Sequence, residues 1–446
     1  MPDDPLPPLT RRGAALAITA GALLVAGLAW TARPPEAGAV WRVAFVTLHV
    51  AGCAGLWALV RRTGPTVGQL VVGAVVFRLI ALPMLPSLSD DGYRYLWDGV
   101  VRVEGGVSPY AFRPSDPRLA ALDDGVLLER MNSPGYYSVY PPASQAVFAA
   151  AAPAHGAQGW RMSWWFLKLL LQIAEGIGIA CLLRRLGPRA TALYAWSPLA
   201  VIEIAGQGHT EALVVAGLGL VLVGGRLPLA SLGATVAGLA KLYPFALLPF
   251  AWRRDGAAGV AVSAALIAGL TALFWTPGAI AHAGESLALF FGTLDEYAAP
   301  YRLLKAALYP LLAESAGRAA SVALSLGFAA VLAGVWLGDD GTRRTLTGAV
   351  LAVVLGVALT STTLHPWYWL PVLFILPLLE SKTWIYWLGC ASSTAYLGYV
   401  LPEAALAATA VGWGGGLLLF VRERPWRHGF EHRVDRRRAG IEADGG

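Results

Sequence analysis

Two adjacent carboxylates, Asp90 and Asp91, open the stretch of this sequence that is best equipped for chemistry. The stretch reads LSDDGYRYLWDGVVRVEGGVSPY and follows an apolar run that ends near Pro86. Neighbouring carboxylates at such a boundary can serve as a general base toward a polar acceptor or as a pair of metal ligands. They can equally cap a helix that begins near Tyr93, because Asp is favoured at helix N-termini. The residue pair by itself leaves these interpretations open.

A second group of candidates lies late in the chain. His365 stands in the segment TSTTLHPWYW, with Trp367 and Tyr368 beside it. A lone histidine is more often a satisfied structural residue, but this one is predicted to lie at the same membrane face as the two carboxylates. Arg302 and Lys305, in APYRLLKAALYP, suit either a phosphate ligand or the neighbourhood of lipid headgroups.

Polar residues also interrupt the apolar stretches, where an ionisable group costs about 3 kcal/mol or more at the centre of a bilayer. A cluster lies at the predicted junction of two helices and consists of Glu203, Gln207, His209 and Glu211. Arg78 and Glu175 lie deeper, and they could form a structural ion pair. We interpret the cluster as a candidate site because it lies near the predicted outer surface.

Tyrosines gather in the segment NSPGYYSVYPP at 132–142, just before a double proline. Aromatic rings at this depth are typical of the interfacial belt of a membrane protein. They also suit the apolar faces of sugar rings. The composition of the segment does not decide between these two roles for Tyr140 and its neighbours.

The composition determines the broad class of protein. The chain has 446 residues, of which 56% are hydrophobic and 14% charged, and its mean hydropathy is +0.57. Soluble globular proteins contain about 25% charged residues, so a soluble enzyme, a disordered chain and a nucleic-acid-binding protein are poor fits. Cys53, Cys181 and Cys390 lie in apolar stretches and are predicted to be core residues. We therefore predict an all-α polytopic membrane protein.

Each apolar stretch of about 20 residues is predicted to form a helix, because backbone groups in lipid must be satisfied within their own segment. Twelve such stretches lie near residues 13–31, 41–60, 67–86, 164–183, 189–207, 209–226, 257–276, 319–338, 346–364, 367–380, 383–401 and 403–421. The segment 228–251 is also apolar, but it lies between Arg226 and Arg253 and is interrupted by Lys241 and Pro244. A re-entrant hairpin of two half-length helices fits it best.

Lys and Arg residues give the orientation, because short cytoplasmic loops are enriched in them. With both termini in the cytoplasm, basic clusters such as Arg61 with Arg62 and Arg343 with Arg344 fall on the inner side. The chain then divides into helices in 1–86, an acidic and aromatic extracytoplasmic loop in 87–163, helices with the hairpin in 164–276, a second outer loop in 277–318, helices in 319–421 and a basic cytoplasmic tail in 422–446. We expect the first loop to carry short interfacial helices.

A set of motifs resembles the GT-C superfamily of integral-membrane glycosyltransferases. The motifs are DDGYRYLWDG with GGVSPYAFRP at 90–114, SVYPP at 138–142, WSPLAVIEIAGQGHTEAL at 196–213, GLAKLYPFALLPFAWRR at 238–254 and LHPWYW at 364–369. Their order is most similar to that in bacterial mannosyltransferases that use polyprenyl-phosphate mannose. Many relatives have one helix before the acidic loop, whereas three are predicted here.

The resemblance implies roles for individual residues. Asp91 matches the catalytic carboxylate, with Asp90 as the neighbouring alternative, and His365 matches a ligand of the donor phosphate. Arg302, Lys305 and Arg94 would assist at that phosphate. The remaining residues assigned to substrate binding are Tyr95, Trp97, Asp98, Tyr140, Glu203, Gln207, His209, Trp367 and Tyr368. No residue is assigned as a metal ligand.

The implied activity is inverting transfer of a hexose, with mannose as the first candidate, from a polyprenyl-phosphate sugar to a glycolipid or glycan. One carboxylate base suffices because phosphate is a good leaving group and needs charge stabilisation rather than an acid. No cofactor is expected to be obligatory, although Asp90 and Asp91 leave a divalent metal open. The expected partners are the donor, the acceptor and the bilayer, without nucleic acid. The active site is expected on the extracytoplasmic side of the plasma (inner) membrane.

Two other functions compete with this expectation. A secondary transporter or lipid flippase would also have about twelve helices and broken segments, but charged residues would then converge at mid-bilayer in both halves. A ligase or polymerase of surface polysaccharide would depend on a large late loop. In this sequence the acidic loop comes early, and charged residues cluster in the predicted outer loops rather than at mid-bilayer.

Overall fold

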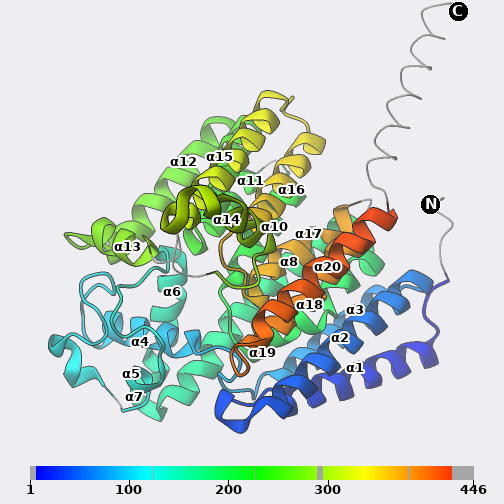
Figure 1. Cartoon of the computed structure of the whole chain (residues 1–446), viewed down its shortest axis with the longest axis horizontal. Helices are drawn as coiled ribbons and strands as arrows, with labels where there is room; N and C mark the ends of the chain where they lie inside the picture. Colours follow the sequence, from blue (N-terminus) through cyan, green and yellow to red (C-terminus); the bar gives the residue numbers. More distant parts are fainter. Residues whose placement is uncertain (1–6, 124, 226, 289–294, 380–381, 424–446) are drawn as a thin grey trace, which may run out of the picture.

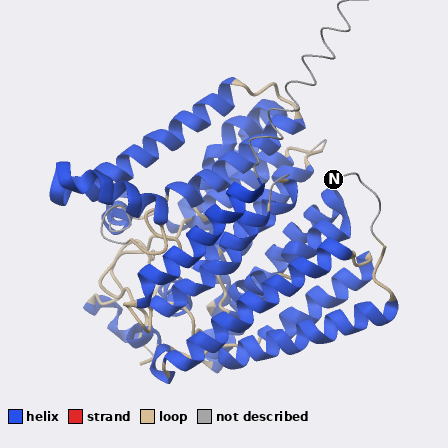
Figure 2. Ribbon diagram, turned by 45° about the vertical axis from the view of Figure 1, so that its right-hand side comes forward, coloured by secondary structure: helices blue, strands red, loops and turns tan. Residues whose placement is uncertain are grey.

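The computed structural model describes residues 7–123, 125–225, 227–288, 295–379 and 382–423. Every regular element within these ranges is helical, and Figure 2 shows loops gathered mostly at one end of the helices. This confirms the prediction of an all-helical chain. Arg226 and most of the predicted basic tail at 422–446 lie outside the described ranges.

Long apolar helices dominate the chain. Among the described residues, seven helical stretches are long and apolar enough to cross a membrane: Arg11–Thr31, Ala39–Arg62, Trp160–Ala195, Tyr243–Phe274, Ala299–Leu337, Arg343–Thr360 and Ala404–Glu423. Shorter apolar helices cover Val67–Ala81, Glu211–Val223, Leu229–Ala240 and Pro366–Leu378. The architecture is therefore that of a helical membrane protein, while the number of twelve spans remains a prediction.

The elements in the first half of the chain are α1 (Arg11–Thr31), α2 (Ala39–Arg62), α3 (Val67–Ala81), α4 (Asp91–Val103), α5 (Leu127–Arg130), α6 (Pro142–Ala151), α7 (Pro153–Gln158), α8 (Trp160–Ala195), α9 (Pro198–Ala200) and α10 (Glu211–Val223). A π-helical segment, η3 (Val201–Gly206), interrupts the chain between α9 and α10. The predicted span 189–207 is therefore not one continuous helix.

The elements in the second half are α11 (Leu229–Ala240), α12 (Leu248–Phe274), α13 (Ala279–Leu287), α14 (Ala299–Leu312), α15 (Ala316–Leu337), α16 (Arg343–Thr360), α17 (Leu370–Ile375), α18 (Thr383–Ala391), α19 (Ala395–Gly398) and α20 (Ala404–Glu423). Short 3-10 turns, among them η4 (Tyr243–Leu247) and η7 (Pro366–Trp369), join several of them. Figure 1 shows α4 to α7 together at one end of the long helices.

The long helices turn apolar side chains outward. Leu16 and Leu23 on α1, Leu326 on α15 and Leu418 on α20 are between 65% and 74% exposed. Soluble monomers rarely expose contiguous apolar surface on this scale. Surfaces of this composition suit the hydrocarbon of a bilayer, where exposed apolar side chains cost nothing.

Close backbone contact holds α10 against α11. A Cβ atom on Gly217 would lie 2.4 Å from the carbonyl oxygen of Gly233, and one on Gly233 would lie 2.3 Å from that of Gly217. Only glycine permits this approach, and small residues are the usual means by which helices pack in membranes. On the other side of α10, Gly219 packs against Gly178 of α8 in the same way.

A buried ion pair ties α3 to α8. Both guanidinium nitrogens Nε and Nη2 of Arg78 lie 2.7 Å from the carboxylate of Glu175. Arg78 also donates to the carbonyl oxygen of Ala195 at 2.8 Å. These contacts satisfy both charges inside the bundle, so the pair has the structural role that the sequence left open.

The predicted hairpin segment 228–251 forms two helical arms. α11 is the first arm and, with 12 residues, it is about 18 Å long at 1.5 Å per residue. Lys241 follows in extended conformation, and η4 with the first part of α12 forms the second arm. At Gly256 the chain turns again, with a φ of 61° that glycine adopts without strain.

Hydrogen bonds of residues in the two arms show their relative direction. The amide of Ser231, near the start of α11, donates to Asp255 at the end of the second arm at 2.7 Å. Thr235 then bonds to Ser263, beyond the turn at Gly256, at 2.9 Å. The two arms are therefore antiparallel, and Lys241 is at the tip of this hairpin. The re-entrant position of the hairpin in a bilayer remains a prediction.

We expect Gly233→Ala to destabilise the protein, because its methyl group would collide with the Gly217 carbonyl. Overpacking of this kind costs about 1–3 kcal/mol. The measurement is the midpoint of thermal unfolding in detergent. Gly269→Ala is the matched control, since a Cβ atom there has no heavy atom within 4 Å. Equal midpoints for the two variants would contradict the close packing of α10 and α11.

Candidate functional site

A large cavity lies where the loop region meets the helical bundle. Its volume is about 1870 Å³, whereas pockets for drug-sized ligands measure roughly 300–1000 Å³. Polar residues of the segments 83–94 and 129–141 line one part, and apolar residues of α16 such as Val354, Val357 and Ala358 line another. The cavity therefore has room for more than one substrate, or for a polar head with an apolar chain.

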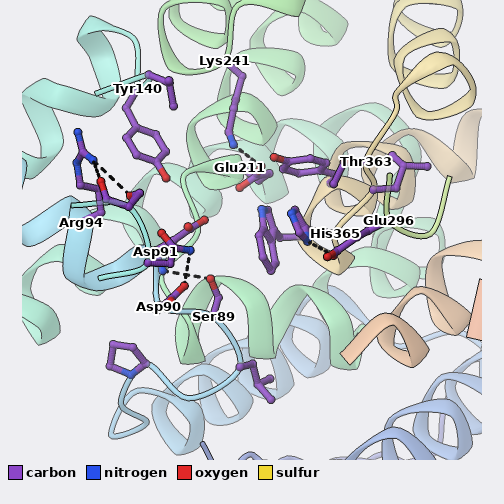
Figure 3. Close-up of a pocket in the computed structure, with 18 of the residues that line it drawn as sticks. Ser89, Asp90, Asp91, Arg94, Tyr140, Glu211, Lys241, Glu296, Thr363 and His365 are labelled. Atoms are coloured by element: carbon purple, nitrogen blue, oxygen red, sulfur yellow. Dashed lines mark hydrogen bonds and ion pairs between the residues drawn. The ribbon is translucent and has the colours of Figure 1, made fainter. Parts of the chain in front are cut away.

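The two adjacent carboxylates are part of the cavity wall. Asp91 is the first residue of α4, and its amide donates to the Ser89 hydroxyl at 3.2 Å. The Asp90 carboxylate accepts a hydrogen bond from the Asn132 amide at 2.6 Å and makes no capping bond to the helix. Figure 3 shows both side chains beside the pocket. Neither carboxylate therefore caps α4, and Asp91 is available for another role.

The environment of Asp91 makes its carboxyl group a weaker acid. Burial, followed by repulsion from Asp90, raises its pKa from 3.8 to about 7. The nearby Lys241 ammonium and a hydrogen bond from Tyr95 act in the opposite direction. A carboxylate with a pKa near neutrality is suited to accept and release a proton in catalysis. Burial also raises the pKa of Asp90.

The segment before α4 is held in place by the neighbouring helices. The Gln207 amide oxygen accepts hydrogen bonds from the amides of Ser87 and Leu88 at 3.0 and 2.9 Å. The Lys168 ammonium on α8 binds the carbonyl oxygens of Leu82 and Met84 at 2.5 and 2.6 Å. Gln207 therefore positions the segment that leads to Asp90 and Asp91, and it does not line the cavity. Lys168 is not among the residues predicted for the site, although in the sequence it is a lysine within an apolar stretch.

Arg94 and Asp98 fix the tyrosine-rich segment onto α4. Arg94 bonds to Asp98 at 2.8 Å and to the carbonyl oxygens of Ser133 and Tyr136 at 3.0 and 3.1 Å. The other Asp98 oxygen accepts from Ser138 at 2.5 Å, and from a glutamine of α6. Asp98 is fully enclosed in this network and does not reach the cavity, whereas Arg94 forms part of its wall.

The aromatic residues predicted for substrate binding take different positions. Tyr140 lines the cavity, and the Tyr95 ring packs edge-on against it at 4.9 Å between centroids. The Tyr95 hydroxyl lies 3.4 Å from the Asp91 carboxylate, so Tyr95 supports Asp91 from below the surface. Trp97, on α4, is buried and does not line the cavity.

The late histidine motif forms the opposite wall. His365, Trp367 and Tyr368 all line the cavity. The His365 ring stacks on Trp367 with centroids 4.5 Å apart, and its Nδ1 lies 2.5 Å from the Tyr399 hydroxyl. Among the described residues no partner is found for its Nε2, which is left for a ligand. Burial and the Lys241 charge lower the pKa of His365 to about 4, so the ring is neutral at neutral pH.

Glu203 and His209 lie behind this wall and not in the cavity. The His209 ring stacks on Trp367 with centroids 4.0 Å apart and lies 3.3 Å from the Glu203 carboxylate. The Tyr396 hydroxyl donates to Glu203 at 2.8 Å. These two residues support the histidine motif and do not contact a ligand in the cavity.

Arg302 and Lys305 are placed away from the cavity. Lys305 lies 2.8 Å and Arg302 3.0 Å from the Asp295 carboxylate. Neither side chain forms part of the cavity wall. Their predicted contact with a donor phosphate therefore finds no geometric support. The neighbouring Glu296 does line the cavity and lies 3.8 Å from His365.

An ion pair that was not assigned to the site lies in the cavity wall. The Lys241 ammonium, at the tip of the hairpin, is 2.9 Å from the Glu211 carboxylate. It also lies 5.1 Å from the centre of the Tyr368 ring. Figure 3 shows Lys241, Glu211, Asp91 and His365 around the same space. The sequence signal was a single lysine that interrupts the apolar stretch 228–251.

Metal ligands are a separate question. Within the described ranges, no group of at least three His, Cys, Asp or Glu side chains is arranged to hold a metal ion. Asp90 and Asp91 remain the pair of oxygen donors that the sequence indicated. The requirement for a divalent metal is tested by adding Mg²⁺ or Mn²⁺ to the transfer assay.

Comparison with protein-family models, with curated proteins and with solved structures finds no match for this chain. The chemistry proposed below consequently depends on the geometry of the cavity and on the motif resemblance.

Asp91 and Asp98 both lie on α4. We expect Asp91→Asn and Asp98→Asn to change the stability of the protein in different directions. Asp98→Asn leaves the buried Arg94 charge uncompensated and should cost about 3–5 kcal/mol. The pKa of Asp91 is raised from 3.8 to about 7 in the folded protein, so this carboxyl group lowers the stability of the fold progressively as the pH rises from about 4 to about 7. Asp91→Asn should therefore maintain or raise the unfolding temperature in detergent at about pH 8.

The same variants at about pH 5 provide the control, because Asp91 is then protonated in the folded protein and Asp91→Asn should have a smaller effect. A loss of stability for Asp91→Asn as large as that for Asp98→Asn would show that Asp91 is a structural residue.

Proposed function

We propose that this protein is an inverting membrane glycosyltransferase of the GT-C type. It transfers a hexose, with mannose as the first candidate, from a polyprenyl-phosphate donor to a glycolipid or glycan at the extracytoplasmic membrane face. The observation that carries the proposal is the position of Asp91, a carboxylate of raised pKa in the wall of a cavity with both charged and apolar surfaces.

Asp91 would act as the general base. In an inverting transfer, the acceptor hydroxyl oxygen forms a bond to the anomeric carbon, and the bond from that carbon to the phosphate oxygen breaks. The acceptor proton passes to the Asp91 carboxylate, and polyprenyl monophosphate leaves. A single base is sufficient because the phosphate leaves without protonation.

The two kinds of cavity wall support a substrate of mixed character. Tyr136 and Tyr140 from the loop line the cavity with aromatic rings suited to sugars. On the other side, Val354, Val357 and Ala358 of α16 offer apolar surface next to His365. A lipid-linked sugar matches this arrangement, with its sugar near Asp91 and its chain toward the helices.

The test is transfer of label from radiolabelled polyprenyl-phosphate mannose to extracted membrane lipids by the purified protein. Asp91→Asn should reduce the rate by about 100-fold or more, because it removes the general base while preserving shape. His365→Ala should also reduce transfer. Asp295→Asn is the control for a charge change near the site, since Asp295 pairs with Arg302 and Lys305 outside the cavity.

Several outcomes would overturn the proposal. Equal transfer by wild type and Asp91→Asn would exclude Asp91 as the base. An absence of transfer from both mannose and glucose donors, with and without added Mg²⁺ or Mn²⁺, would argue against a glycosyltransferase. Activity in an uptake or lipid-scrambling assay would then favour the transporter.

The raised pKa of Asp91 also predicts a pH profile. The base must be ionised to accept a proton, so kcat/KM should rise with pH and level off above a pKa of about 7. The profile is measured with the same transfer assay. A rate that does not change between about pH 5 and pH 8 would mean that no group of this pKa acts as the base.

A further inference from the structure

The hairpin tip brings one cation into the cavity from the far side of the bundle. Lys241 follows α11 directly, and its ammonium lies among side chains of three other motifs. Glu211 begins α10 and Tyr368 belongs to the histidine motif. The ammonium also lies close enough to Asp91 to lower the pKa of the Asp91 carboxyl group.

The position of this lysine is fixed by its neighbours. The Ser144 hydroxyl on α6 donates to the carbonyl oxygen of Ala240 at 3.0 Å, directly before Lys241. The Lys241 amide donates to Ala237 at 2.9 Å, and Phe245 of the second arm packs over Gly238. The hairpin tip is therefore attached to the element that follows the tyrosine-rich loop, and the ammonium has a defined location.

The ion pair leaves hydrogen-bonding capacity on both partners. An ammonium group has three N–H donors, and one carboxylate oxygen at 2.9 Å uses only part of this capacity. The second Glu211 oxygen is buried and has no hydrogen-bond partner within the described part of the chain, and the residue is only 2% exposed. Lys241 is 21% exposed toward the cavity, so an anion there can share it with Glu211.

Several other cations near the reaction centre have partners of their own. Arg302 and Lys305 pair with Asp295 outside the cavity. Arg94 is held by Asp98 and by backbone carbonyl oxygens of the tyrosine-rich loop. His365 is neutral, so its ring donates at most a hydrogen bond. Lys241 contacts Glu211 and Tyr368 and acts on the pKa of Asp91, so it is placed where negative charge would develop between Asp91 and His365.

We propose that the Lys241 ammonium binds the phosphate of the lipid-linked sugar donor and neutralises the charge that this phosphate gains when the sugar leaves. The inference rests on the proposed function. The donor phosphodiester carries one negative charge. After cleavage of the bond between sugar and phosphate, the polyprenyl monophosphate carries a second one, while the acceptor proton is on Asp91. Glu211 positions the ammonium and pairs with it again when the product leaves.

The test is equilibrium binding of undecaprenyl phosphate and of undecaprenol to the purified full-length protein in detergent. Wild type should prefer the phosphate. Lys241→Gln should weaken phosphate binding by about 10- to 100-fold, the range expected for a charge-assisted hydrogen bond, and leave undecaprenol binding unchanged. Lys241→Arg should retain most of the preference.

Matched variants separate this role from general damage. Arg302→Gln and Lys305→Gln remove a charge outside the cavity and should bind like wild type. Since Lys241→Gln leaves Glu211 buried and unpaired, the double variant Glu211→Gln with Lys241→Gln gives a neutral pair that can hydrogen-bond. The double variant should fold and still lose the preference for phosphate.

The results distinguish the inference from the proposed function. Full phosphate preference in Lys241→Gln or in the double variant would overturn the Lys241 assignment, even if wild type transfers sugar. If the preference for phosphate depends on Lys241 but the protein transfers sugar from no donor, the assignment of the phosphate site stands and the proposed enzyme activity is rejected. Equal competition by inorganic phosphate or phosphatidylglycerol would overturn the assignment to a polyprenyl phosphate.

Discussion

The segment between α3 and α4 is not helical, although it lies against an apolar helical bundle. The backbone amides and carbonyl groups of this segment therefore need partners other than water. Gln207, Lys168 and Trp164 provide these partners, since they bind amides and carbonyl oxygens between Leu82 and Leu88. The same segment carries Asp90 and Asp91 to the cavity wall. The placement of the carboxylates therefore depends on Trp164 and Lys168 of α8 and on Gln207 after η3, which do not line the cavity.

Asp98 and Asp91 are both on α4, but they differ in their hydrogen-bond partners and therefore in the role that each can have. Asp98 accepts hydrogen bonds from Arg94 and Ser138 and fixes the tyrosine-rich loop. Asp91 has only a long contact from Tyr95, and it lies near a second carboxylate. A fully satisfied buried carboxylate stabilises the fold, whereas a poorly satisfied one has a raised pKa and is available for proton transfer.

The cavity has polar and apolar walls because elements with different surroundings meet there. The loop elements α4 to α6 contribute carboxylates and tyrosines, while α16 contributes valine and alanine side chains. The hairpin tip adds Lys241, and the segment before η7 adds His365. This combination of an acid, a cation and an apolar surface is the physical basis for proposing a lipid-linked phosphate as a ligand.

Composition and local pattern determined the class of this protein, its helical content and the candidate residues Asp91, Tyr140, His365 and Tyr368. These follow from the sequence because apolar length requires helices in lipid, because ionisable residues are rare in such stretches, and because aromatic residues gather at the membrane interfaces. The tertiary structure alone decided that Arg302 and Lys305 lie outside the cavity while Lys241 lies within it. The sequence predicts the membrane face at which each residue lies. It does not predict which side chains that residue contacts, because those partners come from helices that are distant in the chain.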